Sequence, residues 1–386
     1  MKRFLLPILS LLLSANSAQA ADRPNIIVIF TDDQGFADLG VQGIRDDIRT
    51  PHIDRLADRG VRMTHGFVTA PQCMPSRVGL LTGRYQQRSG VEGNTTGKMH
   101  ENAPTIASEL KKLGYVTGMS GKWGVGGGPN WKDIKADSRV VRKGDLAMLP
   151  AARGFDEYFS GVSTLYAASH DLKGQPITDA PQIARDDGYR VEVQARAAVQ
   201  FIERHAESAR PFFLYYAPYS PHSPFTAPQR YLDQFASVRD EKRQTCLAMM
   251  ACVDDSVGSI VAALKEHKVL DNTIIWYISD NGAPSNGGGL NQPLNGWKGQ
   301  LLDGGIRVPF IVSWPSKLAA GHQYSEMVST LDLLPTCLAV AGREKQPTGL
   351  DGVNLLPFLT GIQDGAPHDA LFFRWMGRAA LRTDQW

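Results

Sequence analysis

The chain has 386 residues, of which 42% are hydrophobic and 21% are charged, and its formal net charge at pH 7 is +2. This length suits one large domain with a smaller appendage, and the composition is that of an ordinary globular protein. Because the net charge is close to zero, no overall field attracts the chain to nucleic acid or to a membrane surface, so any anion binding has to be local.

The first 20 residues are typical of a targeting segment. Lys2 and Arg3 precede an apolar run at 4–13 that is too short to span a bilayer comfortably. Residues 18–20 match a small-x-small cleavage site. We therefore expect a signal peptide at 1–20, export to the periplasm or the extracellular space, and no stable membrane insertion. A retained anchor is the alternative interpretation.

Strand-like and helix-like patterns alternate along the rest of the chain. The run at 25–30 is continuously apolar with branched side chains, as in a central strand that is covered on both faces. Further strands are predicted at 62–69, 115–120, 212–216, 271–278 and 308–313, and helices at 50–57, 105–113, 190–205 and 241–268. This alternation predicts an α/β fold with a large, mostly parallel central sheet and helices on both faces.

Two regions depart from this alternation. Residues 126–154 contain glycine and proline and have weak periodicity, so we expect a long loop that lines a substrate cleft. From residue 350 the pattern changes to a hairpin with strands at 370–375 and 379–386, and a lone hairpin is only marginally stable. We therefore expect a catalytic domain over 21–345 and, over 346–386, the start of a small C-terminal antiparallel sheet that is truncated.

The chain has four cysteines, which an exported protein can pair. Cys246 and Cys252 lie on one helical pattern and face different sides of it, so they cannot easily form a disulfide. Together with Cys337 they have apolar neighbours and are interpreted as core residues. Cys73 differs from these three because prolines flank it on both sides.

Cys73 is expected in a turn at the start of a short helix that also contains Arg77. Backbone N–H groups and the helix dipole favour negative charge there, and Arg77 adds a positive charge four residues on. The pattern predicts a nucleophile and an anion site within one turn. A buried structural cysteine is the alternative, and this short motif alone does not separate the two.

Acidic and amide side chains come directly after two of the predicted strands. Asp32 and Asp33 follow the first strand, and Asp280 and Asn281 follow the strand at 271–278. Because the carboxyl ends of parallel strands meet at one edge of a sheet, we expect these side chains to converge. Three carboxylates and an amide are hard oxygen ligands, suited to Ca²⁺ or Mg²⁺ rather than zinc. A surface turn is the alternative use of the adjacent aspartates.

Cationic side chains gather in the same way. Lys122 and His222 also follow predicted strands, and with Arg77 and Lys298 they supply donors for a tetrahedral anion. Taken singly, the lysines can be solvated surface residues, and His222 can serve only to hydrogen-bond the backbone. A divalent cation, a cationic cradle and a nucleophile together are suited to attack on a sulfuryl or phosphoryl centre.

With these motifs in this order, the chain resembles the type I sulfatase family, the formylglycine-dependent, arylsulfatase-like members of the alkaline-phosphatase superfamily. The resemblance runs from about residue 25 to residue 386. The motifs that carry it are Asp32-Asp33, Cys73-x-Pro75-Ser76-Arg77, Leu81-Thr82-Gly83-Arg84, Gly121-Lys122-Trp123, Pro221-His222, Asp280-Asn281-Gly282, Lys298-Gly299 and Gly304-Gly305-Ile306-Arg307-Val308-Pro309. So many motifs in the family's order make the resemblance highly specific.

The resemblance implies a sulfuric ester hydrolase that releases inorganic sulfate from a sulfated carbohydrate or an aryl sulfate. It implies that a formylglycine-generating maturation enzyme oxidises Cys73. One hydroxyl of the hydrated aldehyde then attacks the sulfur and the other expels the sulfate. The implied ligands of one Ca²⁺, in preference to Mg²⁺, are Asp32, Asp33, modified Cys73, Asp280 and Asn281.

The resemblance also implies roles for the remaining residues. Arg77 steadies the formylglycine, and Ser169 contacts the substrate region. The sulfate is bound by Lys122, His222 and Lys298, and either His222 or Lys298 assists the leaving oxygen.

One position departs from the family pattern. The family has a histidine after Gly-Lys-Trp that helps to deprotonate the formylglycine diol, and this chain has Gly124 there. Since proton transfer is often worth about 10²–10⁴ in rate, another group has to substitute, with His100 and His170 as candidates, or turnover is slow. The alternative functions are a phosphonate monoester or phosphodiester hydrolase of the same superfamily and a catalytically weak, sulfated-glycan-binding homologue.

Overall fold

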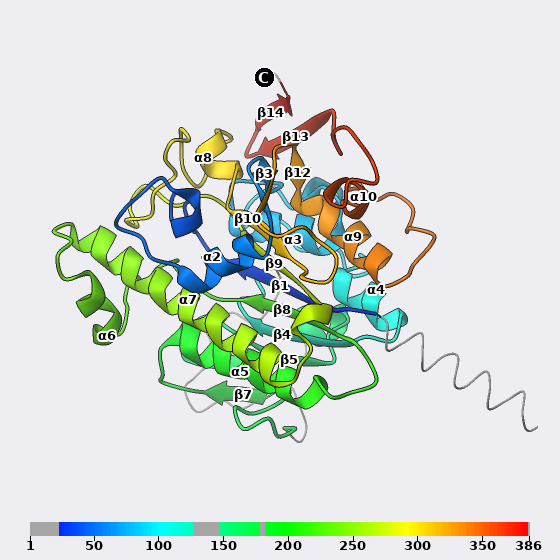
Figure 1. Ribbon diagram of the computed structural model, residues 1–386, viewed down its shortest axis with the longest axis horizontal. Helices are drawn as coiled ribbons and strands as arrows, with labels where there is room; N and C mark the ends of the chain where they lie inside the picture. The colour runs from blue at the N-terminus through cyan, green and yellow to red at the C-terminus, as the bar shows by residue number, and fades with distance from the viewer. Residues whose placement is uncertain (1–22, 127–146, 178–181, 385–386) are drawn as a thin grey trace, which may run out of the picture.

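The computed structural model describes residues 23–126, 147–177 and 182–384. The expected signal peptide at 1–20 and most of the expected loop at 126–154 lie outside these residues. The main element is a ten-stranded sheet in the order β11-β2-β10-β9-β1-β8-β4-β5-β6-β7 (Figure 1). In that order the strands are His322–Tyr324, Gly60–Met63, Phe310–Ser313, Thr273–Ser279, Asn25–Thr31, Phe212–Ala217, Val116–Gly121, Glu157–Gly161, Leu165–Ala168 and Gln182–Arg185.

The centre of the sheet is parallel. Strands β9, β1, β8, β4 and β5 run in one direction, whereas β10 is antiparallel to β9 and β6 is antiparallel to β5. This confirms the predicted α/β fold with a mostly parallel central sheet and adds antiparallel strands on both sides of that centre. Strand β1 is buried along its whole length, as its unbroken apolar run predicts.

Helices cover both faces of the sheet (Figure 1). On one face α2, α5 and α7 pack against Ile27 and Ile29 of β1, and on the other α3, α4 and α9 pack on the side of Ile26 and Val28. These helices are α2 Pro51–Asp58, α5 Arg190–His205, α7 Glu241–Glu266, α3 Cys73–Thr82, α4 Ile106–Lys112 and α9 Leu333–Val340. The alternation follows from the period of two along a strand, which sends neighbouring side chains to opposite layers.

Helix α7 is the one helix, within the part of the chain that the structure describes, long and apolar enough by length and composition to cross a membrane. Of its most apolar window, 72% is buried inside the protein. The helix packs against α5, α2 and the sheet, so its apolar composition is that of a core helix.

Several local predictions differ from the structure. The strand predicted at 62–69 is two short strands: β2 belongs to the main sheet, and β3 (Gly66–Phe67) pairs with β12 (Val328–Ser329) in a separate one. A turn at Thr64 and His65 separates them. The short, partly polar strands β5, β6 and β7 were not predicted. The C-terminal hairpin is confirmed as β13 (Ala370–Trp375) and β14 (Arg378–Thr383). All four cysteines are buried and free.

Candidate active site

The carboxyl edge of the parallel strands carries the candidate site. Asp32 and Asp33 follow β1, Asp280 and Asn281 follow β9, and Lys122 follows β4. The segment after β8 supplies His222, the first turns of α3 supply Cys73 and Arg77, and the loop after β9 supplies Lys298. The structure therefore brings together all the predicted site residues except Ser169.

Backbone contacts fix the two aspartates that follow β1. Asp32 N donates to Ser220 O at 3.1 Å, which ties the end of β1 to the segment after β8. Asp33 has a left-handed φ of 67°, and its N donates to Asp280 Oδ1 at 3.1 Å. A left-handed backbone is uncommon outside glycine, although aspartate tolerates it better than most residues. The turn places both carboxylates beside residue 73.

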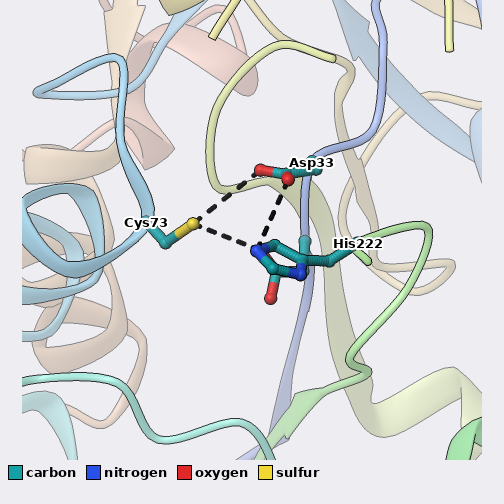
Figure 2. Close-up of side chains that lie close together, drawn as sticks. Asp33, Cys73 and His222 are labelled. Atoms are coloured by element: carbon teal, nitrogen blue, oxygen red, sulfur yellow. Dashed lines mark hydrogen bonds and ion pairs between the residues drawn. The ribbon is translucent and has the colours of Figure 1, made fainter. Parts of the chain in front are cut away.

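Cys73 is the first residue of α3, and its Sγ points towards the carboxylate of Asp33 and the imidazole of His222 (Figure 2). It lies 3.3 Å from Asp32 Oδ1, 3.8 Å from Asp33 Oδ1 and 3.3 Å from Lys298 Nζ. Burial, and then the negative charges of Asp280 and Asp32, raise the pKa of the Cys73 thiol well above its usual value. This corrects the expectation of a thiol activated by the helix terminus, because the carboxylates and the burial outweigh the dipole.

Arg77 is completely buried and faces Asp280. Its Nε and Nη2 atoms donate to Asp280 Oδ2 at 3.1 and 2.7 Å, and its Nη1 donates to Lys122 O and to the hydroxyl of Tyr215. Burial alone would lower the pKa of Arg77, but Tyr215, Asp280 and Asp32 together raise it, so the guanidinium stays charged. Burial and the charge of Asp32 raise the pKa of Asp280 to about 7.

The two lysines are paired with the two adjacent aspartates. Lys122 Nζ lies 2.6 Å from Asp32 Oδ2, and Lys298 Nζ lies 2.6 Å from Asp33 Oδ1. Although burial opposes the charged form, Asp32 raises the pKa of Lys122, and Cys73 and Asp33 raise that of Lys298. Neither lysine is the solvated surface residue of the alternative interpretation, because each ammonium is largely buried against a carboxylate.

His222 adds a ring nitrogen to the groups around residue 73. Its Nδ1 lies 2.8 Å from Ser223 O, which assigns the proton to Nδ1 and leaves Nε2 facing Asp33 Oδ2 at 3.6 Å. Burial is the main cause that lowers the pKa of His222. Sequence reasoning missed Tyr219, whose ring stacks on the imidazole at 4.6 Å and lies 5.0 Å from Lys122 Nζ. An aromatic side chain two residues after a strand was its only sequence signal.

The donor set fits a hard divalent cation. Ligand atoms of Asp32, Asp33, Cys73 and His222 all lie within 4.8 Å of one another. Asn281 Nδ2 donates to Asp33 Oδ1 at 2.7 Å, but the buried Asn281 Oδ1 has no hydrogen-bond donor among the described residues. Because an unpaired buried carbonyl oxygen costs free energy, a bound cation is a natural partner for it. The carboxylate and amide oxygens match Ca²⁺ or Mg²⁺.

A second acidic group, His52, Asp254 and Asp255, also brings ligand atoms together. There, however, Asp254 accepts hydrogen bonds from the N–H groups of His52 and Ile53 at the start of α2. This carboxylate caps a helix, and nothing else in the group points to a ligand.

The prediction for Ser169 is corrected by the direction of β6. Because β6 runs antiparallel to β5, it ends near the amino end of β5, and Ser169 lies beside Tyr158 and not at the carboxyl edge of the sheet. Ser169 Oγ accepts from Tyr158 N at 2.8 Å, and His170 Nδ1 lies 3.7 Å from Glu157 Oε2. Ser169 and His170 therefore belong to a polar cluster outside the site, so His170 does not replace the missing histidine.

Gly124 lies at the site, with a left-handed φ of 60°. A Cβ added there would be 3.3 Å from Arg77 Cδ and 3.3 Å from Lys122 Cε. His100, the other substitute that the sequence suggested, is exposed, and its Nδ1 accepts from Asn102 N. Within the described residues, neither histidine takes the place of a side chain at 124.

Gly124 also lines a cavity of about 340 Å³ that opens beside residue 73. Lys122, Asn94 and Ser160 are its polar side chains, and most of the other lining is apolar or glycine. The cavity is within the size range of small-molecule sites, about 300–1,000 Å³. Its lining side chains are Cys73, Met74, Asn94, Lys122, Trp123, Val125, Leu149, Ser160 and Val162.

This sheet edge gathers carboxylates, an amide oxygen and buried cations around one small side chain. Such a set of groups is suited to a divalent cation and to a tetrahedral oxoanion. The family model "Sulfatase" matches residues 24–343. The chain therefore belongs to the sulfatase family, whose members hydrolyse sulfate esters.

Relatives and solved structures agree with this family. The chain is 32% identical over 353 residues to arylsulfatase J of Mus musculus, covering 86% of this chain and 55% of that protein. It is 31% identical to N-acetylgalactosamine-6-sulfatase of Canis lupus familiaris, and the match covers 92% of this chain and 70% of that protein. The structure of Ps i-CgsB in complex with k-i-k-neocarrahexaose matches with a TM-score of 0.81 and 32% identity, covering 94% of this chain and 83% of that chain.

Proposed function

We propose that this protein is a sulfatase that hydrolyses a sulfate ester of a carbohydrate or an aryl alcohol and releases inorganic sulfate. The observation that carries the proposal is the position of residue 73, whose Sγ lies 3.3 Å from both Asp32 Oδ1 and Lys298 Nζ. An atom that attacks from this point faces charged donors that can stabilise the negative oxygens of a sulfuryl transition state.

The proposal includes oxidation of Cys73 to formylglycine by a maturation enzyme. It is supported by the Cys73-x-Pro75-Ser76-Arg77 motif and by the raised pKa of the thiol, because a protonated, buried thiol is a poor nucleophile. In the structure Sγ stands in for an oxygen of the hydrated aldehyde. That group supplies an oxygen nucleophile that is regenerated in each cycle.

Asp32, Asp33, Asp280 and Asn281, together with residue 73, would hold Ca²⁺. The unpaired Asn281 Oδ1 and the clustered ligand atoms support this assignment. The ion would supply positive charge that favours the ionised form of the attacking group and polarises the sulfate.

The chain's own cations bind and orient the ester. Lys122 and Lys298 lie on two sides of residue 73, and His222 presents Nε2 to the same space. Hydrolysis breaks the bond between sulfur and the alcohol oxygen, and that oxygen must take a proton as it leaves. Lys298 is placed to deliver this proton. His222 can deliver it from Nε2 only in its protonated form, because the neutral ring carries its proton on Nδ1.

The cavity beside Gly124 supports a substrate whose sulfate is attached to a ring. Its volume and mostly apolar lining suit one aryl or sugar ring. An N-acetylgalactosamine-6-sulfatase and a complex with k-i-k-neocarrahexaose among the similar proteins favour a sulfated carbohydrate.

The proposal is tested by measuring sulfate release on one preparation from a panel of sulfated mono- and oligosaccharides and from an aryl sulfate. The mass of the peptide that contains residue 73 and the bound calcium are measured on the same sample. We expect sulfate release that depends on formylglycine and Ca²⁺. A clear preference for a phosphodiester or a phosphonate monoester would overturn the proposal, and tight binding of a sulfated sugar without sulfate release would indicate a binding protein.

We also propose export through a signal peptide at 1–20, with the catalytic domain over 21–345 and the small C-terminal subdomain starting at 346. The support is the charged start, the apolar run and the cleavage-site pattern of the first 20 residues. Fractionation of the native host and the N-terminal sequence of the mature protein test this. A cytoplasmic chain that keeps Met1 would contradict it.

A further inference from the structure

One side chain of the C-terminal hairpin touches the loops that carry two of the site residues. Trp375, at the end of β13, donates from Nε1 to Gln72 Oε1 at 3.1 Å, and Gln72 directly precedes Cys73. The far end of the same indole lies against Gly299, which directly follows Lys298: a Cβ added to Gly299 would be 3.6 Å from Trp375 Cη2.

These two loops are also joined to each other. Gly299 N donates to Pro71 O at 2.8 Å. Gly299 has a left-handed φ of 84°, a conformation that glycine adopts without strain, and the missing side chain leaves room for the indole. Trp375 therefore covers the point at which the Cys73 turn and the Lys298 loop meet.

Gln72 also connects the segment that carries Asn94 to the place where these two loops meet. Its Oε1 accepts from Asn94 N at 3.2 Å as well as from Trp375, and Asn94 Oδ1 in turn accepts from Met74 N at 3.0 Å. Gln72 is the N-cap residue of α3 but makes no side-chain hydrogen bond to that helix. Its side chain instead bonds to Trp375 and to the backbone of Asn94, and these contacts support the first turn of α3.

The hairpin is anchored firmly enough to act as a support. Phe373 is buried and packs against Phe67 with ring centroids 6.0 Å apart. Arg374 O accepts from Gln87 Nε2 at 2.8 Å, and Arg382 pairs with Asp303 at 3.0 Å. In Figure 1 the hairpin lies above β3 and β12, at the same end of the molecule as the short helix α8 (Asp303–Ile306).

We propose that Trp375 is a positioning residue for the sulfatase reaction: it holds residue 73 and Lys298 at their working separation through Gln72 and Gly299. This inference rests on the proposed function. Trp375 contacts neither Asp32 nor Asp280 in the described contacts, so it acts on the attacking atom and its neighbouring ammonium rather than on the carboxylates. A displacement of about 1 Å at such a point can cost about 10²-fold in rate.

The test uses Trp375→Phe, which keeps an aromatic ring beside Gly299 but removes the donor to Gln72. We expect kcat to fall about tenfold or more with little change in KM. Gln72→Leu should give a loss at least as large, because it also removes the acceptor of Asn94 N. The double variant should lose little more than Gln72→Leu alone, because the hydrogen bond from Trp375 is then already absent. A purely structural role would lower the melting temperature and leave kcat unchanged well below it.

A second readout does not need turnover. In chain purified with an unmodified thiol, we expect Trp375→Phe to speed alkylation of Cys73 severalfold, whereas Cys246, Cys252 and Cys337, which are buried elsewhere, react as before. The matched control is Phe372→Ala, an aromatic of the same strand that is 60% exposed. Unchanged kcat and unchanged Cys73 alkylation would overturn the inference. If the parent chain releases no sulfate while the alkylation rate still rises, the proposed function fails and the positioning contact stands.

Discussion

Arg77 and Asp280 form an ion pair with both side chains completely buried, and Nη2 lies 2.7 Å from Oδ2. They come from helix α3 and from the end of strand β9, so the pair joins the residue-73 turn to the centre of the sheet. Removing one partner of a buried pair leaves an uncompensated charge, which is much more costly than the net value of the pair itself.

Arg77→Leu should therefore destabilise the protein by about 3–5 kcal/mol, measured by urea unfolding. The matched control is Arg45→Leu, an exposed arginine that pairs with Asp47 at 3.6 Å, where we expect a change within about 1 kcal/mol. Equal effects of the two substitutions would mean that Asp280 is compensated by other groups.

Cys73→Ser tests the proposed oxidation of residue 73. Serine keeps the size of the side chain but is not a substrate for thiol oxidation, so we expect folded protein whose steady-state kcat is lower by about 10³-fold or more. A single turnover without recycling is compatible with the proposal. Steady-state turnover close to that of the parent, together with an unmodified residue 73 in the parent, would refute the formylglycine mechanism.

Asn281→Leu tests the metal assignment through binding rather than activity. Because Asn281 Oδ1 is the buried oxygen without a donor, its loss should weaken Ca²⁺ binding at least tenfold by titration calorimetry and reduce the rise in melting temperature on adding Ca²⁺. Asn291→Leu is the control, because the Asn291 amide is satisfied by the backbone of Ala283 and Gly296. That variant should lose stability and keep its calcium affinity.

Glu157 gives the fold a defined response to acid. Burial acts to raise the pKa of Glu157, but hydrogen bonds from His205 and Arg204 overcome it and lower the pKa from 4.5 to about 2. A depressed carboxyl pKa stabilises the fold above the unfolded value, near pH 4.5, and this contribution disappears as the pH falls towards 2. Glu157→Gln should therefore cost about 1–2 kcal/mol at pH 7 and progressively less below pH 4.5.

Urea unfolding at several pH values measures this dependence. The control is Glu203→Gln, a substitution of an exposed glutamate on α5, which we expect to have a small effect at every pH. A loss for Glu157→Gln that is the same at pH 3 and pH 7 would show that the effect is not electrostatic.

Val162→Trp tests the cavity beside Gly124. The larger side chain at the cavity wall should exclude part of a bound ring and lower kcat/KM for a ring sulfate by about tenfold or more, with an unchanged melting temperature. Val199→Trp is the control, because Val199 lines a separate groove of about 310 Å³ beside α5 and α7. Equal kinetics for the two variants would exclude this cavity as the place where the substrate ring binds.

The residues at the ends of the parallel strands could be predicted from sequence because one rule places them. Asp32, Asp280 and Lys122 each follow an apolar run, and strands that run in one direction deliver their next residues to one edge. The motif around Cys73 and Arg77 added the helix that faces this edge.

Other parts of the site depend on contacts between distant segments. The antiparallel direction of β6, which removes Ser169 from the site, is set by pairing with β5 and not by any local pattern. The contact between Trp375 and Gln72 joins residues 303 positions apart and leaves no periodic signal in either segment. The raised pKa of the Cys73 thiol comes from burial and from carboxylates that follow the distant strands β1 and β9.

The ion pairs of the site also bear on how a cation and an anion would bind there together. Asp32, Asp33 and Asp280 are matched one to one by Lys122, Lys298 and Arg77, so the charges of the six groups cancel when all of them are ionised. If Ca²⁺ binds there as proposed, it would add two positive charges to the cluster, and an inorganic sulfate dianion would cancel them. Since linkage between two ligands is reciprocal, sulfate should tighten the hold on calcium as much as calcium tightens the hold on sulfate. Bound product sulfate would then slow the dissociation of Ca²⁺. In a medium with little calcium, the supply of ester would therefore determine how long the protein keeps its ion.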